Sequence, residues 1–162
     1  MPEDEVNDRV RVVFQLEQND GWPPVASEGL WAIPVAADLV RIDNVPWFVR
    51  DLSLNDIVRT RTDARGALEA VEKVSWSGNC TVRIIPYEPG RFSGDPQGVI
   101  DIFSPLGVRA EGIEQFGMIA LSVPSSADIP GVKGLLIRGS ESDWWDYEES
   151  CVGNAWAASN PR

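Results

Sequence analysis

The sequence predicts an α+β protein in which a small antiparallel β-barrel-like half precedes a ferredoxin-like half of βαββαβ order. Two observations lead to this fold class. Up to Ser77, short apolar segments recur about every 8–12 residues between Gly, Pro, Asn and Asp residues, as in small barrels and sandwiches. After Gly78, extended segments alternate with segments of helical periodicity. The length of 162 residues suits one domain or two very small ones.

The first half is expected to contain a series of short extended segments. They lie over residues 10–17, 25–34, 39–42, 47–50, 57–61 and 68–77. Turn-forming residues separate them, including Asn19-Asp20-Gly21, Asp43-Asn44 and the hairpin connection at 63–66. Together these segments predict an antiparallel β-barrel-like subdomain over 9–77.

The second half alternates strands with two short helices. We expect strands over 81–87, 108–116, 118–123 and 143–151. The first helix is capped by Ser93 or Asp95 and ended by Gly107, and the second is capped within 125–128 and ended by Gly139. The resulting order predicts a ferredoxin-like subdomain over 78–152. Residues 1–8 and 153–162 are expected to be flexible ends, except where Trp156 can dock.

The charge balance limits the class of partner. Fourteen Lys and Arg residues stand against 25 Asp and Glu residues, which gives a formal charge of −11. Such a surface repels nucleic-acid phosphates and anionic lipid, so we expect neither nucleic-acid nor membrane binding. The acidic start lacks the apolar core of a signal peptide, and no apolar run is long enough to cross a bilayer, so a cytoplasmic protein is expected.

The residue types present also limit the chemistry. The chain has no histidine, which excludes Ser-His-Asp and Cys-His catalysis and His-ligated zinc from within it. We expect no metal, no cofactor and no catalytic residue. Two cysteines, Cys80 and Cys151, are too few for a disulfide framework. In the predicted topology they lie at the same end of neighbouring strands, either as two separate buried thiols or as a dithiol able to oxidise with Cα atoms within about 7 Å.

Three segments carry an unusual pattern. They are W-P-P-V-x-S-E-x-L-W over 22–31, D-N-V-P-W-F over 43–48, and the acidic segment around 147–151. In these segments the sequence resembles an uncharacterised bacterial family, domain of unknown function 4265, over roughly residues 9–153. The resemblance implies membership of that family, with no established activity to carry over.

Glu28 is the carboxylate with the most unusual neighbours, because Ser27 precedes it and Trp31 follows it. A desolvated glutamate can work as a general acid or base. Equally, Glu28 can be a satisfied polar residue that accepts hydrogen bonds in a turn. The first interpretation leads to one candidate function, a small-molecule enzyme or ligand sensor with a pocket between the two halves. That pocket would be lined by Trp22, Glu28, Trp31, Arg41, Trp47 and Arg50.

The other candidate function rests on an acidic, aromatic segment near the end of the chain. Its residues are Asp143, Trp144, Trp145, Asp146, Tyr147, Glu148 and Glu149. Alternate residues of a strand point to opposite faces, so at least one of the three aromatic side chains is expected to be exposed among the acids. Such a surface suits a basic protein partner, which predicts a non-catalytic binding protein of the immunity or antitoxin type. A solvated acidic edge strand that resists aggregation is the alternative interpretation.

Overall fold

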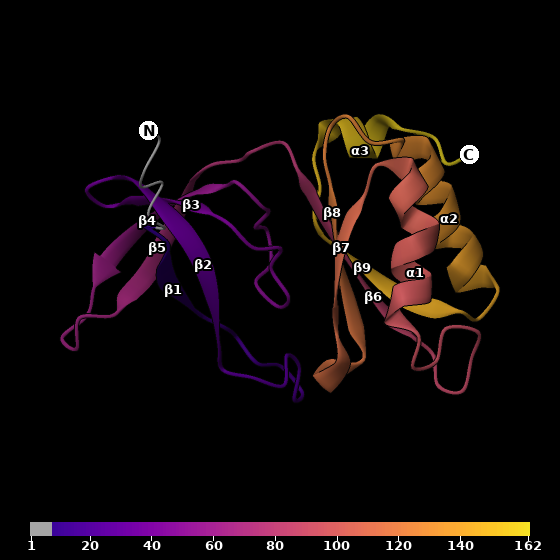
Figure 1. Cartoon of the computed structure of the whole chain (residues 1–162), viewed down its shortest axis with the longest axis horizontal. Coiled ribbons are helices and arrows are strands. Elements are labelled where there is room, and N and C mark those ends of the chain that lie inside the picture. Colours follow the sequence, from indigo (N-terminus) through magenta and orange to yellow (C-terminus); the bar gives the residue numbers. More distant parts are fainter. Residues whose placement is uncertain (1–7) are drawn as a thin grey trace, which may run out of the picture. The chain divides into compact units, whose positions relative to one another are not determined.

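The computed structural model describes residues 8–162, and the chain divides into two compact units, one up to Ser77 and one from Gly78 (Figure 1). The predicted flexible start, apart from Asp8, lies outside the described residues. The fold is α+β, with a closed five-stranded barrel and a second antiparallel sheet. Among the described residues, no helix is both long and apolar enough to cross a membrane.

The first unit is the barrel. Its strands are β1 (Val10–Gln15), β2 (Ser27–Ala36), β3 (Leu39–Ile42), β4 (Ile57–Thr62) and β5 (Leu68–Ser75). Sequential strands pair antiparallel, but β1 and β5 close the barrel in parallel through Val12 with Leu68 and Val13 with Glu69. The expectation of an all-antiparallel half is therefore wrong at the seam. Strands that alternate in direction around a closed ring of odd number must leave one parallel pair.

Alternation along the strands builds the barrel core. Val12 lies opposite Leu30 across β1 and β2, and Ala32 lies opposite Ile42 across β2 and β3. All four are buried because alternate side chains of each strand point into the barrel. The segment between β3 and β4, residues 43–56, contains neither helix nor strand, so the segment expected over 47–50 is not a strand. It adds Val49 and Leu52 to the same core, together with Val40 and Val58 from the strands.

The second unit packs helices against a four-stranded sheet. Its main elements are β6 (Cys80–Pro86), α1 (Pro96–Phe103), β7 (Arg109–Ile113), β8 (Met118–Val123), α2 (Ile129–Glu141) and β9 (Trp145–Cys151). The sheet order is β7-β8-β6-β9, which makes β9 an edge strand. Two 3-10 turns, η1 (Ser104–Leu106) and η2 (Glu114–Phe116), follow α1 and β7, and a short helix α3 (Asn154–Ala158) follows β9.

Both α1 and α2 lie along one side of this sheet (Figure 1). One apolar cluster joins alternate residues of β6 and β8 to the inner faces of the helices. Trp145, at the start of β9, is fully buried in it beside Phe92 and Phe103. The N-caps are carboxylates: Asp95 accepts from the Gly98 N–H at 3.0 Å and Asp128 from the Gly131 N–H at 3.2 Å.

The predicted end of the second helix at Gly139 is wrong, because α2 continues to Glu141. Gly139 is a packing residue instead. A Cβ atom there would lie 2.1 Å from Cε2 of Trp145, so only glycine lets the indole ring approach the helix. The predicted strand 108–116 is also too long, since β7 ends at Ile113 and η2 follows.

The tail after residue 152 is ordered rather than flexible. It forms α3, and Trp156 within it is buried in the core of the second unit. The Lys133 ammonium donates to the backbone oxygens of Trp156 and Ser159, both at 2.7 Å. Gly134 lets the backbone of Arg162 pack directly against α2, because a Cβ atom at Gly134 would lie 1.9 Å from the backbone oxygen of Arg162.

Candidate functional site

Glu28 holds the irregular segment 43–56 by its backbone. Its side chain is buried, and the N–H of Trp47 donates to Oε1 at 2.7 Å. The N–H groups of Phe48 and Val49 both donate to Oε2 at 2.9 Å. Three backbone donors therefore occupy both carboxylate oxygens, as expected for the satisfied polar residue and not for a free acid or base.

The other residues of the predicted Glu28 pocket are spread around this segment. Trp31 is half-exposed beneath Arg9 and Arg11, whose guanidinium carbons lie 5.0 and 5.7 Å from its ring centroid. Within the described residues, Arg41 Nε and Trp47 Nε1 are buried without a hydrogen-bond partner.

Two members of the predicted pocket, Trp22 and Arg50, line a cleft of about 350 Å³ in the first unit. Trp22 lies edge-on to Phe48, with ring centroids 5.8 Å apart, and has 39% of its surface exposed. This edge-on contact joins the W-P-P and D-N-V-P-W-F segments into one surface feature.

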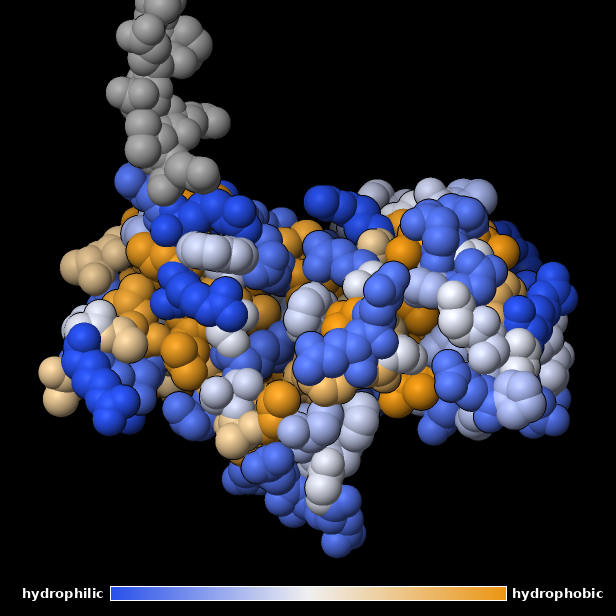
Figure 2. Space-filling model, turned by 60° about the horizontal axis from the view of Figure 1, so that its bottom comes forward, coloured by the Kyte–Doolittle hydropathy of each residue, from blue (hydrophilic) through white to orange (hydrophobic). Residues whose placement is uncertain are grey.

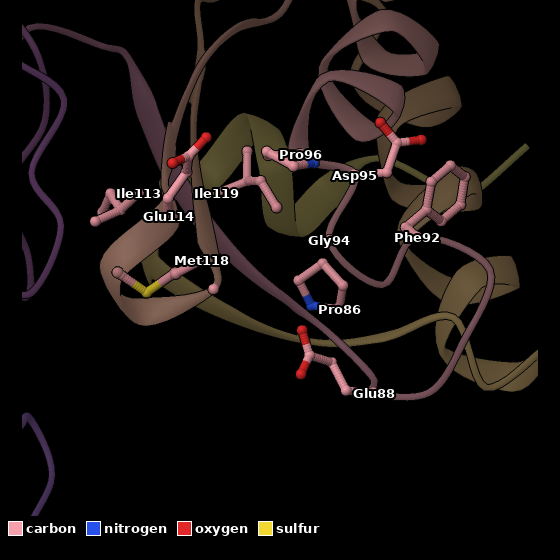
Figure 3. Close-up of a pocket in the computed structure, with 11 residues that line it drawn as sticks. Pro86, Glu88, Phe92, Gly94, Asp95, Pro96, Ile113, Glu114, Met118 and Ile119 are labelled. Atoms are coloured by element: carbon pink, nitrogen blue, oxygen red, sulfur yellow. The ribbon is translucent and has the colours of Figure 1, made fainter.

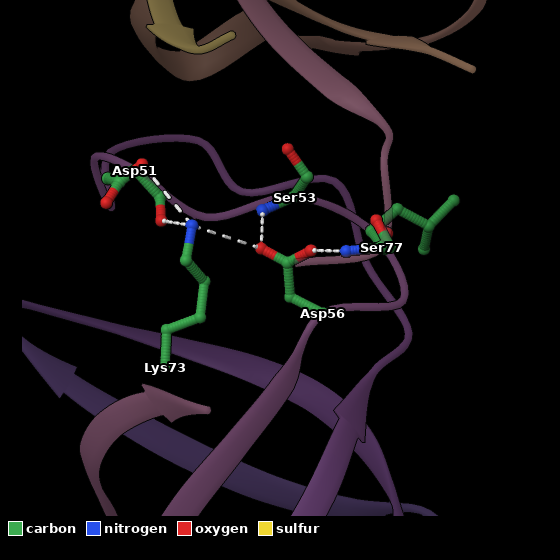
Figure 4. Close-up of polar contacts among 6 residues, drawn as sticks. Asp51, Ser53, Asp56, Lys73 and Ser77 are labelled. Atoms are coloured by element: carbon green, nitrogen blue, oxygen red, sulfur yellow. Dashed lines mark hydrogen bonds and ion pairs between the residues drawn. The ribbon is translucent and has the colours of Figure 1, made fainter. Parts of the chain in front are cut away.

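A second buried carboxylate, Asp56, was not singled out from the sequence. It accepts hydrogen bonds from the N–H groups of Ser53 at 2.8 Å and Ser77 at 2.7 Å, and the Lys73 ammonium lies 3.8 Å away (Figure 4). Burial raises the pKa of Asp56, while these hydrogen bonds and Lys73 oppose the rise. Like Glu28, it accepts hydrogen bonds from the backbone of the segment before β4. Ser53 is only three positions away, whereas Ser77 is 21 positions away and leaves no local sequence signal.

The predicted partner-binding residues divide into buried and accessible sets. Trp145 is fully buried, and its indole N–H donates to the backbone oxygen of Leu136 at 3.1 Å. Its place on an accessible surface is therefore wrong, because it faces the helices and α2 offers Gly139 beneath its ring. Trp144 and Tyr147 are half-buried at the edge of the same core.

The acids of this segment remain largely accessible. Asp143, Asp146 and Glu149 are exposed, whereas Glu148 pairs with the buried Arg83 at 3.2 Å. Burial raises the pKa of Tyr147, and the charges of Glu149 and Asp146 raise it further. We call Asp143, Trp144, Asp146, Tyr147 and Glu149 the acidic edge surface, since all but two of these residues lie on the edge strand β9.

A cleft of about 240 Å³ lies in the same unit (Figure 3). Apolar side chains form its floor, and Glu88, Asp95 and Glu114 stand around them. All three carboxylates are exposed, and the lining contains no basic side chain. We call this feature the acidic cleft. Its apolar floor and carboxylate rim suit a ligand group that is both aliphatic and cationic.

The two cysteines are both buried, and neither is joined to another cysteine by a disulfide. Thr81, and not Cys80, lies directly opposite Cys151 across β6 and β9. Burial raises the pKa of the Cys80 thiol, with a smaller contribution from Cys151, which disfavours the reactive thiolate. Oxidation of this pair stays a prediction.

Among the described residues, no group of three or more His, Cys, Asp or Glu side chains is arranged to hold a metal ion. Figure 2 shows one face of the molecule, on which hydrophobic residues form patches between hydrophilic ones.

Comparisons with known proteins bear on fold and family. One solved structure, described as "Novel crystal structure of a hypothetical protein from Neisseria gonorrhoeae", is similar to this chain. The similarity covers 91% of this chain and 96% of that chain, with 24% sequence identity and a TM-score of 0.71. At this identity the similarity concerns the fold alone. A comparison with curated proteins finds no match. The sequence model of the family described as "Domain of unknown function (DUF4265)" matches residues 28–147, so the chain belongs to this family.

Proposed function

We propose that this protein is a non-catalytic binding protein that captures a basic protein domain, as an immunity protein or antitoxin captures a toxin. The observation that carries the proposal is the acidic edge surface, where Asp143, Asp146 and Glu149 are exposed beside two half-buried aromatic side chains. Tyr147 lies beside Asp146 and Glu149, whereas the Arg91 guanidinium lies over the Trp144 ring. An aromatic anchor beside acidic groups suits a steered interface with a basic partner. The net charge of −11 would accelerate encounter with a basic partner.

The acidic cleft supports the same partner chemistry. A lysine or arginine side chain could lay its aliphatic stem on the apolar floor and direct its charge to Glu88, Asp95 or Glu114. The buried carboxylates also support a binding role over an acid–base role. Glu28 and Asp56 are both bound by backbone N–H groups that they hold in place.

The test is a capture experiment with charge-reversed variants. Wild type, D146K/E149K and the control D8K/E17K are immobilised and exposed to lysate of the native cell, and bound proteins are identified by mass spectrometry. The two double variants change the net charge equally, but Asp8 and Glu17 are exposed residues of the other unit. We expect wild type and the control to retain one basic protein that D146K/E149K loses.

Kinetics on the captured protein then test the mechanism. D146K/E149K should slow association and weaken its salt dependence, because the steering charge is reversed. Trp144→Ala should instead speed dissociation, because a packed anchor acts mainly on residence time. Adding wild type should inhibit the captured protein's activity. Capture of the same protein by all three baits, or capture of an acidic one, would contradict the proposal.

A ligand-sensing barrel is the second candidate, favoured by the cleft beside Trp22, Phe48 and Arg50. Its volume of about 350 Å³ lies within the range of small-molecule sites, about 300–1,000 Å³. Trp22→Ala would then abolish a ligand-induced change in tryptophan fluorescence.

We also infer that the second unit is ferredoxin-like and that the protein is cytoplasmic. The element order β6-α1-β7-β8-α2-β9 and the sheet order β7-β8-β6-β9 support the first inference. Cys80 and Cys151, which are not joined by a disulfide, support the second inference, since thiols persist in a reducing compartment.

A further inference from the structure

A second cleft in the same unit has the opposite charge. It has a volume of about 400 Å³ and lies beside α1, η1 and α2. Its lining includes three arginines, Arg91, Arg138 and Arg162, and one acid, Asp128. The rest is mainly apolar, with Leu106, Leu135 and the ring of Trp144 among the lining. This cleft shares Trp144 with the acidic edge surface, but its three arginines belong neither to that surface nor to the acidic cleft.

Two of the three guanidinium groups have no Asp or Glu partner. Within residues 8–162, no Asp or Glu side chain lies within ion-pair distance of Arg91 or Arg138, whereas Arg162 pairs with Asp128. Arg91 lies over the Trp144 ring, 4.5 Å from its centroid, and Arg138 donates to the backbone oxygen of Arg162 at 3.1 Å.

Some arginines of the described residues do pair with acids: Arg59 contacts both Asp38 and Glu72, and the buried Arg83 contacts Glu148. Others in this part of the chain, such as Arg65 and Arg109, have no ion pair, so what distinguishes Arg91 and Arg138 is that both line one largely apolar cavity. A guanidinium group carries five N–H donors, so Arg91 and Arg138 have donor capacity left for an external anion at the cavity.

We infer that this cleft binds an organic anion with an apolar body. The anionic head accepts hydrogen bonds from the guanidinium groups of Arg91 and Arg138, which present fork-shaped donors suited to an oxyanion. The body lies against Leu106, Leu135 and Trp144. A simple anion without that body binds weakly, because the net charge of −11 repels it and only apolar contact offsets the repulsion.

The test uses the fluorescent anion 8-anilinonaphthalene-1-sulfonate as the probe, with the full chain in its folded state. We expect saturable binding at one site. Octanoate should displace the probe, whereas equal concentrations of octanol, which lacks the charge, and acetate, which lacks the chain, should not. Displacement by octanol as effective as by octanoate would overturn the inference, and so would the absence of saturable binding.

Variants locate the site. Two cleft variants, Arg91→Met and Arg138→Ala, should each weaken octanoate binding about tenfold, because each loses a charge-assisted hydrogen bond. The methionine keeps an apolar side chain over Trp144. Arg65→Ala removes the same charge from an exposed turn of the other unit and should bind as wild type does. Near-ultraviolet circular dichroism checks that each variant keeps its tertiary packing. Wild-type affinity in both cleft variants would contradict the assignment.

Discussion

The two units differ in what they bury next to their connecting segments. In the barrel, the irregular segment 43–56 is held by the buried carboxylates Glu28 and Asp56, which accept hydrogen bonds from its backbone. In the second unit, the loop after Pro86 delivers Phe92 into the core, where it stacks on Trp145 with centroids 5.6 Å apart. The barrel therefore holds its long connection with charged hydrogen-bond acceptors, and the second unit holds its loop by burying an aromatic ring.

The difference follows from backbone hydrogen bonding. A segment without helix or strand leaves its N–H groups unpaired, and burial makes each unpaired donor costly. The barrel meets this cost with acceptors from β2 and from the residue before β4. In the second unit α1 and α2 satisfy most of their own backbone, and Asp95 and Asp128 cap their first turns. Buried acids are therefore expected where loops are long, and buried aromatics where helices cover a sheet.

The largest expected effect comes from Trp145→Ala. It removes a fully buried indole, its stacking on Phe92 and its hydrogen bond to Leu136. We expect the free energy of unfolding of the second unit to fall by about 3–5 kcal/mol, measured by urea denaturation. Trp144→Ala is the matched control. Because Trp144 is only half-buried, its loss should cost clearly less, and equal losses would contradict the aromatic account.

The next largest loss in the free energy of unfolding is expected for Glu28→Ala, at about 3 kcal/mol. It leaves the N–H groups of Trp47, Phe48 and Val49 without their acceptor in a buried place. Glu28→Gln keeps one acceptor oxygen and should lose less. Limited proteolysis reports the effect locally: the alanine variant should become cleavable within 43–56. An intact segment in Glu28→Ala would show that the core contacts of Val49 and Leu52 suffice.

Asp56→Asn should cost about 1 kcal/mol at neutral pH, because one of its two backbone donors loses its acceptor. The pH dependence is more specific. Since the pKa of Asp56 is raised in the folded state, the folded protein binds this proton more tightly than the unfolded chain does. Its contribution to stability therefore falls as pH rises from about 4 through the raised pKa. The stability difference between wild type and Asp56→Asn should shrink over that range, and a growing difference would reverse the assigned direction.

The smallest effect on stability is expected for D146K/E149K, within about 0.5 kcal/mol, since both side chains are exposed. Thermal unfolding measures it. A large loss of stability would mean that Asp146 and Glu149 stabilise the fold. The capture experiment would then have to use variants with one charge reversal each.

Local signals in the sequence were sufficient for much of the secondary structure. The strands Leu39–Ile42 and Met118–Val123 have the predicted bounds, and Asp95 is one of the two residues predicted to cap the first helix. These features depend on residues a few positions apart. Membership of the family was also correctly predicted from the three segments with unusual patterns.

Contacts between distant residues were not predictable in the same way. The partners of Glu28 lie about twenty positions further along the chain, so the sequence left its two interpretations open. Gly139 has the pattern of a helix end but is required by the ring of Trp145. Alternation along β9 showed that one face would be buried, yet it could not place Trp145 on that face without knowing where α2 lies.

The parallel seam of the barrel has a consequence for how this unit folds. Val12 and Leu68 meet there from opposite ends of the unit, whereas β1 with β2 and β4 with β5 join neighbouring segments. Loop-closure entropy rises with the length of chain enclosed, and non-local pairings slow folding. We therefore expect the hairpins to assemble early and the seam to form last. A pairing that forms last should also open most readily. In a native-state hydrogen-exchange experiment, the amide protons of β1 and β5 should therefore exchange through the opening of lowest free energy in the barrel.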